Sequence, residues 1–154
     1  MSHQDDLGYM RRAIAIAQAN LGLTQPNPVV GCVLVNDGAL IAEAATAPGG
    51  RPHAEELALA AAGTAARGAV AYVTLEPCGA RSIPGAVSCA ERLAAAKVSR
   101  VVFACSDPSP YASGRGAESL RAAGVHVEGG LLAEEAAFLA TEHIATLGSS
   151  APRG

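Results

Sequence analysis

The chain has 154 residues, is 50% hydrophobic and carries a formal net charge of −3 at pH 7. This length fits one domain with its own core, and the acidic balance argues against a nucleic-acid-binding protein, which normally shows a basic stripe. No apolar stretch is long enough to span a bilayer, and the N-terminus does not resemble a signal peptide. Four cysteines without such a signal favour a reducing cytosol and metal binding over a disulfide framework.

The first third of the chain predicts a helix and then a β-hairpin. Five apolar side chains recur at helical spacing, after acidic residues at positions 5 and 6: Leu7, Met10, Ile14, Ala17 and Leu21. The apolar run from Val29 to Val35 predicts a buried strand. Asn36-Asp37-Gly38 is a tight-turn signal, so we expect Leu40 to Glu43 to return as the hairpin partner.

From there helices and strands alternate. The expected elements are a helix from Pro52 that ends before Gly63, a strand from Val70 to Leu75, a helix from Ser88 to Ala96, a strand from Val101 to Cys105, a short helix from Glu118 to Ala123, a strand from Val125 to Val127, and a last helix from Leu132 to Thr146. This alternation predicts an α/β fold with a parallel or mixed sheet covered on both faces. We expect one domain over residues 1–148, followed by a C-terminal tail, 149–154.

One histidine and two cysteines lie where they could share a metal ion. His53 is expected at the start of a helix, Cys78 just past a strand, and Cys89 near the start of the next helix. Sites in open α/β sheets lie beyond the carboxyl ends of the strands, and helix N-termini favour deprotonated cysteines. Three protein ligands with an open position are typical of catalytic zinc, whereas structural zinc is usually closed by four. The sequence therefore predicts a Zn2+ site.

Glu55 follows the predicted histidine ligand by two residues. H-x-E followed by P-C and a second cysteine is the signature of zinc-dependent deaminases. Zinc lowers the pKa of its bound water from 15.7 to about 7, and a carboxylate that is not a ligand can carry the proton to a departing amine. His-x-Glu alone is common by chance, but the ordered set favours a metal site. We predict that Glu55 is catalytic.

Three other residues have simpler interpretations. Cys32 and Cys105 lie inside apolar strands and are expected to be small core residues. Asn27 stands between two prolines, where turn chemistry is the ordinary explanation. An amide that binds substrate near the zinc is the alternative for Asn27, and residue type alone slightly favours the turn.

Longer stretches outside the metal motif carry a wider resemblance. They are Met10 to Ile14, Thr24 to Gly31, Thr74 to Cys78, Asp107 to Pro110 and Leu120 to Val125. Through them the chain, from about Leu7 to about Leu139, resembles the pyrimidine deaminase domain of riboflavin biosynthesis, in the cytidine deaminase-like superfamily. The resemblance implies a three-layer α/β/α sandwich with a central five-stranded mixed sheet. It also implies zinc ligation by His53, Cys78 and Cys89, with proton transfer by Glu55.

The resemblance also assigns substrate-binding residues. It makes Asn27 a substrate contact and places Asp107 at the ribose or phosphate end of the pocket. The family usually has a histidine where this chain has Thr46, and a shorter, histidine-containing segment where this chain has residues 79–88. Arg81, in that longer segment, could grip a phosphate with its bidentate guanidinium or be a solvated loop residue. None of these departures falls on a predicted metal ligand. They therefore leave the identity of the substrate undecided, whereas the predicted type of reaction is unaffected.

The resulting hypothesis is a stand-alone zinc-dependent deaminase that hydrolyses an exocyclic amine on a pyrimidine-like heterocycle. The best candidate substrate is the phosphoribosylated diaminopyrimidine of riboflavin biosynthesis, and another nucleobase, nucleoside or specialised-metabolism heterocycle is the alternative. Rival functions are a non-catalytic zinc-stabilised binding module and an RNA-editing deaminase, which scarce aromatics and the acidic balance disfavour. The expected partner is a small-molecule substrate, and we expect no binding to nucleic acid or to a membrane. We also expect a cytoplasmic protein that forms a homo-oligomer of two or four chains.

Overall fold

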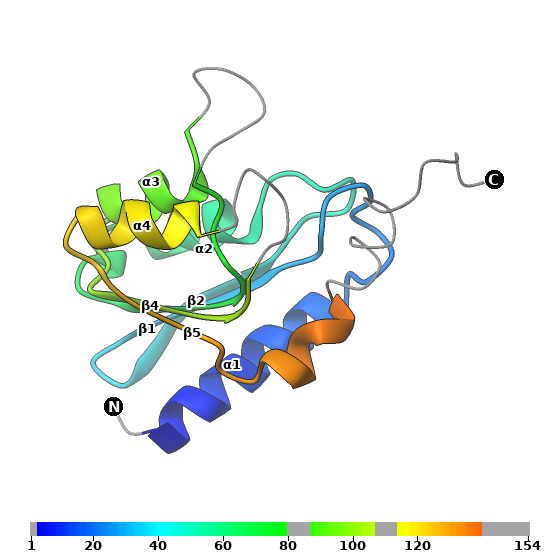
Figure 1. Cartoon of the computed structure of the whole chain (residues 1–154), viewed down its shortest axis with the longest axis horizontal. Helices are drawn as coiled ribbons and strands as arrows, with labels where there is room; N and C mark the ends of the chain where they lie inside the picture. The colour runs from blue at the N-terminus through cyan, green and yellow to red at the C-terminus, as the bar shows by residue number, and fades with distance from the viewer. Residues whose placement is uncertain (1–2, 80–86, 107–113, 140–154) are drawn as a thin grey trace.

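One mixed sheet of five strands lies between two layers of helices (Figure 1). The computed structural model describes residues 3–79, 87–106 and 114–139. Its elements are α1 (His3–Gln18), β1 (Gly31–Asn36), β2 (Ala39–Ala45), α2 (Ala54–Ala62), the 3-10 helix η1 (Gly63–Ala66), β3 (Val70–Leu75), α3 (Cys89–Ala95), β4 (Arg100–Cys105), α4 (Arg115–Ala122) and β5 (His126–Gly129). Residues 133–139 are also helical. The predicted α/β/α sandwich with a five-stranded mixed sheet is confirmed.

The strand order is β2-β1-β3-β4-β5. β1 pairs antiparallel with both β2 and β3, whereas β3, β4 and β5 are parallel. The carboxyl ends of β3 and β4 therefore meet at one edge, where Leu75 pairs with Cys105. This is the edge at which open α/β sheets place their ligands.

The hairpin between β1 and β2 forms at the predicted turn. Asp37 has a φ of 51° and Gly38 a φ of 75°, which are the two positive values that a two-residue type I′ turn requires. The returning strand, β2, is longer than expected and reaches Ala45. It carries the chain back toward the edge where the functional site lies.

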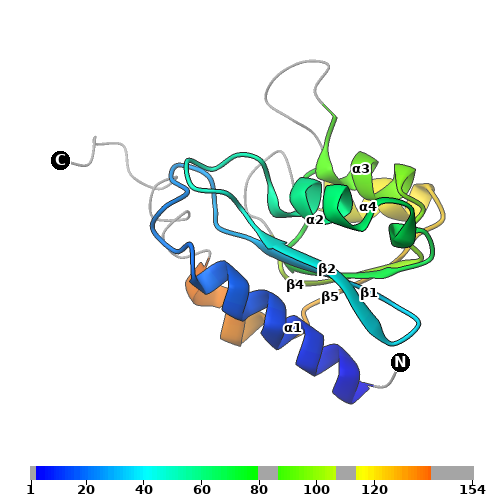
Figure 2. The ribbon, with the colours of Figure 1, turned by 180° about the vertical axis from the view of Figure 1, so that it is seen from behind.

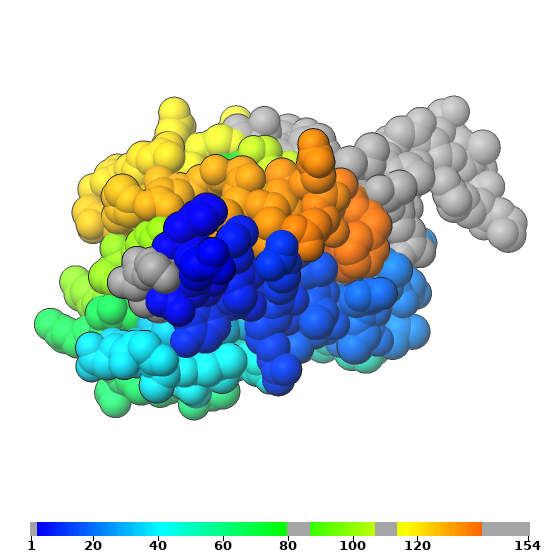
Figure 3. All heavy atoms as spheres, turned by 90° about the horizontal axis from the view of Figure 1, so that it is seen from below, coloured from blue at the N-terminus to red at the C-terminus, as the bar shows by residue number. Residues whose placement is uncertain are grey.

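Helices cover the two faces of the sheet unequally (Figures 1 and 2). α1 and the helix of residues 133–139 lie side by side on one face (Figure 3), where Arg11 Nη2 is 3.2 Å from Glu135 Oε2. α2, α3 and α4 cover the other face. α1 approaches β1 so closely that a Cβ on Gly31 would lie 2.0 Å from the Ala13 carbonyl oxygen. A glycine is therefore required at the first position of β1.

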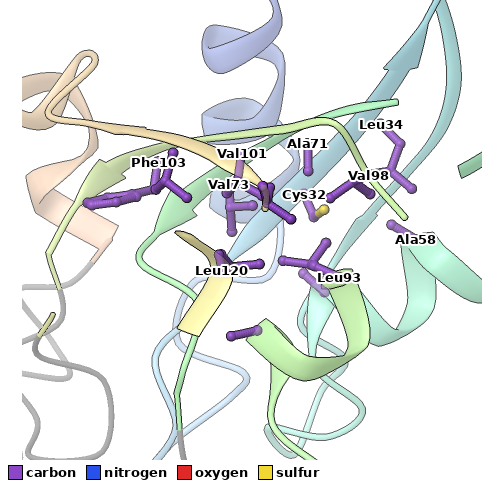
Figure 4. Packing of buried hydrophobic residues seen from close by; sticks show 14 of the residues in the cluster. Cys32, Leu34, Ala58, Ala71, Val73, Leu93, Val98, Val101, Phe103 and Leu120 are labelled. Atoms are coloured by element: carbon purple, nitrogen blue, oxygen red, sulfur yellow. The ribbon is translucent and has the colours of Figure 1, made fainter. Parts of the chain in front are cut away.

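The core beneath α2, α3 and α4 consists mainly of small and medium-sized aliphatic side chains, together with the aromatic ring of Phe103 (Figure 4). Its fully buried members include Cys32, Leu34, Ala58, Leu93 and Leu120. Cys32 is thus the core residue that its apolar strand predicts. Cys105 is half-buried, and its thiol donates to the Ala133 carbonyl oxygen at 3.3 Å. The alanines allow the helix backbones to lie near the sheet, which brings the starts of α2 and α3 close to the end of β3.

Several predicted boundaries are wrong at helix ends. Pro52 lies outside α2, because the helix begins only after His53, whose backbone is extended. α1 ends at Gln18, and Leu21 is 39% exposed beyond it. α4 begins three residues before the expected Glu118. The end of the last predicted helix and the tail 149–154 lie outside the described residues.

A buried ion pair fastens α1 to the sheet. Asp6 is 7% exposed and accepts hydrogen bonds from Arg100 Nη1 at 3.0 Å and Arg100 Nη2 at 2.9 Å. The Tyr72 hydroxyl, on β3, also donates to Asp6, and Arg100 donates to Glu128 on β5. The hydrogen bonds from Arg100 lower the pKa of Asp6, against the opposing effect of burial. The network therefore joins α1 to three strands.

We expect Asp6→Asn to lower the free energy of unfolding by about 2–3 kcal/mol at pH 7, because it breaks a bidentate charged pair that is largely buried. Urea denaturation measures this difference. Asp5→Asn is the matched control, since it removes the same charge from an exposed side chain on the same helical turn and should lower stability by clearly less than Asp6→Asn does.

The same pair predicts a pH dependence. The folded pKa of Asp6 lies below its unfolded value of about 3.9, so the stabilisation is complete above that value and is lost as the pH falls through the folded pKa. The difference in unfolding free energy between wild type and Asp6→Asn should be constant at neutral pH and shrink below about pH 4. A difference that grows on acidification would contradict this assignment.

Candidate metal centre

His53, Cys78 and Cys89 converge beyond the carboxyl end of β3. One candidate ligand atom from each residue lies within 4.8 Å of the other two, and His53 Nδ1 is 3.3 Å from Cys89 Sγ. Ligand atoms that share a tetrahedral zinc ion lie about 3.5–3.8 Å apart. One imidazole and two thiols are also donors that zinc prefers. The three residues therefore fit a single zinc ion.

Two helix starts present the histidine and one cysteine. His53 is the N-cap of α2, with extended backbone angles φ −72° and ψ 157°. Cys89 is the first residue of α3, directly after the N-cap Ser88, whose hydroxyl accepts from the Glu91 amide at 3.1 Å. A capped helix start holds its first residue in a defined direction. Both candidate ligands therefore lie at the starts of helices, and the capped start of α3 holds Cys89 in place.

The third candidate ligand, Cys78, lies three residues after β3 and faces the start of α3. The Cys89 amide donates to Cys78 Sγ at 3.3 Å, and the Ala90 amide donates to the Cys78 carbonyl oxygen at 3.1 Å. Amide donors and the positive end of a helix dipole favour a thiolate over a thiol. This geometry stabilises the form of Cys78 that binds a metal.

Glu55 is buried in the first turn of α2, only 4% exposed. Burial is the largest influence on this carboxyl group and raises the pKa of Glu55 to about 7. The nearby His53 and a hydrogen bond with Cys89 act in the opposite direction. Such a carboxyl group can hold or release a proton near neutral pH, as a general acid–base residue must.

Asn27 has a structural contact beside the site. Its side-chain amide donates to the Gly50 carbonyl oxygen at 2.9 Å, and its backbone amide donates to the Thr24 carbonyl oxygen at 3.0 Å. A Cβ on Gly50, whose φ is 92°, would lie 2.7 Å from Asn27 Nδ2. Asn27 thus ties its own turn to the loop that precedes His53. Its role as a substrate contact stays a prediction.

Thr46 is almost fully buried, with 1% of its surface exposed. Its hydroxyl accepts from the Val30 amide at 3.0 Å and donates to the Val30 carbonyl oxygen at 3.4 Å. The side chain therefore joins the segments that flank β1 and β2, and its substrate role stays a prediction. Arg81 and Asp107, the other two predicted substrate contacts, lie outside the described residues.

Glu76 is a residue of the site that sequence reasoning missed. Its carboxylate is buried, 3% exposed, and accepts from the amides of Gly114 at 3.2 Å and Ala117 at 3.4 Å. The sequence held one signal for this role. Glu76 stands between an apolar strand and a predicted ligand, where burial is expected, and a buried carboxylate needs hydrogen-bond partners. The partners themselves lie far along the chain.

Comparison with known proteins places this arrangement in a family. The family described as "Cytidine and deoxycytidylate deaminase zinc-binding region" matches residues 3–105. The chain is 48% identical over 130 residues to the riboflavin biosynthesis protein RibD of Escherichia coli K12, and the match covers 83% of this chain and 34% of that protein. The chain thus spans about a third of the length of this curated relative.

Two solved structures share the fold at substantial identity. RibD of Acinetobacter baumannii, form 2, has a TM-score of 0.87 and 43% identity, over 97% of this chain and 42% of that one. A diaminohydroxyphosphoribosylaminopyrimidine deaminase/5-amino-6-(5-phosphoribosylamino)uracil reductase from Thermotoga maritima has a TM-score of 0.85 and 38% identity, over 93% of this chain and 41% of that one.

All three candidate zinc ligands, and Glu55 beside them, fall inside the residues that the family matches. The donor set and the family agree on zinc as the cofactor. The chain belongs to the cytidine and deoxycytidylate deaminase zinc-binding family.

Proposed function

We propose that this chain is a zinc-dependent hydrolytic deaminase that removes an exocyclic amine from a pyrimidine-like heterocycle. The observation that carries the proposal is the convergence of His53, Cys78 and Cys89 beside the buried carboxyl group of Glu55. A purely structural zinc site usually has four protein ligands and needs no proton carrier. The arrangement supports catalysis over a zinc-stabilised binding module.

The substrate we propose is the phosphoribosylated diaminopyrimidine of riboflavin biosynthesis. Support comes from the relatives, since the E. coli protein is named for riboflavin biosynthesis and the T. maritima protein for a deaminase of this compound. Asn27, Thr46, Arg81 and Asp107 are the proposed substrate contacts. Another aminated nucleobase or nucleoside is the alternative that the departures from the family pattern leave open.

The proposed chemistry divides between the metal and one carboxyl group. Zinc held by His53, Cys78 and Cys89 would acidify water to a pKa of about 7 and so supply a nucleophile at neutral pH. Glu55 takes a proton from that water and delivers it to the departing amine, so that water is consumed and ammonia is released. Its burial keeps bulk solvent from the carboxyl group, and its place in the first turn of α2 keeps it beside the histidine.

The metal assignment predicts that purified protein contains one zinc ion per chain. Cys89→Ala is expected to lose it, because two remaining protein ligands hold zinc weakly. Cys105→Ala is the control, since Cys105 contacts Ala133 and is not in the ligand cluster. Elemental analysis measures both variants. Retention of zinc by Cys89→Ala would contradict the proposed ligand set.

The role of Glu55 predicts a separation of chemistry from metal binding. Glu55→Gln is expected to reduce kcat by about 100-fold or more, the usual contribution of a general acid–base residue, and to keep its zinc. Glu56→Gln is the matched control, because it makes the same substitution at the next residue of α2. The carboxylate of Glu56 faces Arg92 and is not in the ligand cluster, with Oε2 3.9 Å from Arg92 Nη2. Ammonia release measures the rates. A non-catalytic binding module predicts no turnover by wild type and unchanged ligand binding in Glu55→Gln.

The substrate proposal is tested with a panel of aminated heterocycles. We expect the highest kcat/KM for the phosphoribosylated diaminopyrimidine. Cytosine and cytidine should give lower values because they lack the phosphate that the proposed contacts include, and deoxycytidylate should give a lower value because its ring is not the diaminopyrimidine. Faster turnover of another panel member would overturn the proposed substrate and would leave the proposed reaction unchanged. No turnover of any member by the zinc-loaded protein would overturn the deaminase proposal. A gel shift with tRNA tests the RNA-editing alternative.

We also propose a cytoplasmic homo-oligomer of two or four chains. None of the four cysteines forms a disulfide, and thiols that bind a metal persist in a reducing compartment. Within the described ranges, none of the helices is both long and apolar enough to cross a bilayer. The alanine-rich helices would permit close contacts between copies.

A further inference from the structure

Glu76 connects the segment that carries Cys78 to a distant helix. Its backbone amide donates to the Cys105 carbonyl oxygen at 2.8 Å, which extends the pairing of β3 with β4 by one residue. Its side chain then reaches the start of α4, where Oε1 accepts from the Gly114 amide at 3.2 Å and Oε2 from the Ala117 amide at 3.4 Å. Both oxygens of this buried carboxylate are thus used on one helix.

Within the described part of the chain, no side chain of α4 or of its N-cap residue caps the start of this helix. Gly114, its N-cap, has a φ of 80° and no side chain that could accept a hydrogen bond. A negative charge at a helix N-terminus is favourable because it meets the unpaired amides and the positive end of the helix dipole. Glu76 supplies that charge from the end of β3. The position of α4 therefore depends on the segment that leads to Cys78.

The backbone of that segment rests directly on the first turn of α4. A Cβ on Gly116 would lie 1.7 Å from the Pro77 carbonyl oxygen. A Cβ on Gly79 would lie 2.7 Å from Arg115 Cβ. No side chain can separate the two backbones at these points, so a displacement of α4 would displace the residues on either side of Cys78.

On its other side, Cys78 contacts the start of α3 through the Cys89 and Ala90 amides. The ligand segment is therefore held between the first turns of two helices. The α3 contact acts on Cys78 directly, and the α4 contact acts through Glu76 and Gly116.

We propose that Glu76 is a positioning residue for the metal centre, which holds Cys78 at the zinc ion by fixing α4 against the ligand segment. Glu76 touches neither zinc nor substrate in this role. The inference rests on the proposed ligand set and goes beyond it, because it states that a residue outside that set influences the affinity for zinc.

The test measures zinc affinity by competition with a chromophoric chelator at a temperature where every variant is folded. Glu76→Gln is expected to weaken zinc binding by about 10- to 100-fold, the range found for groups that orient metal ligands. The amide keeps the shape of the side chain and presents an N–H to one of the two backbone N–H groups. Gly116→Ala should also weaken zinc binding, because its methyl group would force Pro77 and α4 apart although no polar group is lost.

Two controls separate positioning from general destabilisation. Asp6→Asn weakens the fold on the opposite face of the sheet and should leave zinc affinity unchanged. Gly8→Ala controls for the glycine-to-alanine change itself: its methyl group on α1 would meet no atom within 4 Å beyond its chain neighbours and the nearby helix backbone, so zinc affinity should also stay unchanged. In cobalt-substituted protein, the thiolate absorption bands should shift in Glu76→Gln and not in Asp6→Asn.

The outcomes are distinct. Equal zinc affinity and an unchanged cobalt spectrum in both Glu76→Gln and Gly116→Ala would overturn the positioning role while the metal centre stands. A wild-type protein that binds no zinc would overturn the metal centre itself. If Glu76→Gln does not fold, the affinity of Gly116→Ala decides the question.

Discussion

Three candidate ligand atoms, two sulfurs and one imidazole nitrogen, lie within reach of one ion because one strand ends and two helices begin at the same edge of the sheet. β3 delivers Cys78 to this edge, and α2 and α3 begin there with His53 and Cys89. The amides at the start of α3 then meet the Cys78 sulfur and carbonyl oxygen. The same amides at the start of α3 also favour the thiolate of Cys78, so the hydrogen bonds that form the fold also suit the proposed metal site.

This arrangement requires backbones to lie unusually close together. Gly31 allows α1 to approach β1, and Gly116 allows α4 to approach the segment that precedes Cys78. Alanine serves the same purpose in the buried faces of α2 and α3. A larger side chain at any of these places would separate layers whose spacing sets the distances at the site. Small residues are therefore part of the functional geometry, although they carry no chemistry.

The two faces of the sheet use polar groups for different purposes. On the α1 face, the Asp6–Arg100 pair joins a helix to three strands far from the metal centre. On the other face, buried Glu55 and Glu76 lie close in the chain to the zinc ligands. One carboxyl group has a raised pKa and is suited to proton transfer, whereas the other is fully used by backbone amides. Burial alone does not decide the role of a carboxylate; its partners do.

Local patterns in the sequence predicted all five strands and the zinc chemistry, although β1 begins two residues after the expected Val29 and β5 one residue after the expected Val125. The run Val70–Leu75 predicted β3 with both ends correct, because a short apolar segment between breakers has little choice of structure. Helix ends were less predictable, since Leu21 continues the helical spacing after α1 has already stopped. The residue types and order of His53, Glu55, Cys78 and Cys89 predicted a zinc site, because donor chemistry is a property of side chains.

Only the tertiary structure decided that Thr46 is bonded to Val30 and that Glu76 caps α4, since those partners lie 16 and about 40 residues away. Sequence periodicity reports which face a side chain occupies, and it carries no information about which distant backbone amide that face will meet.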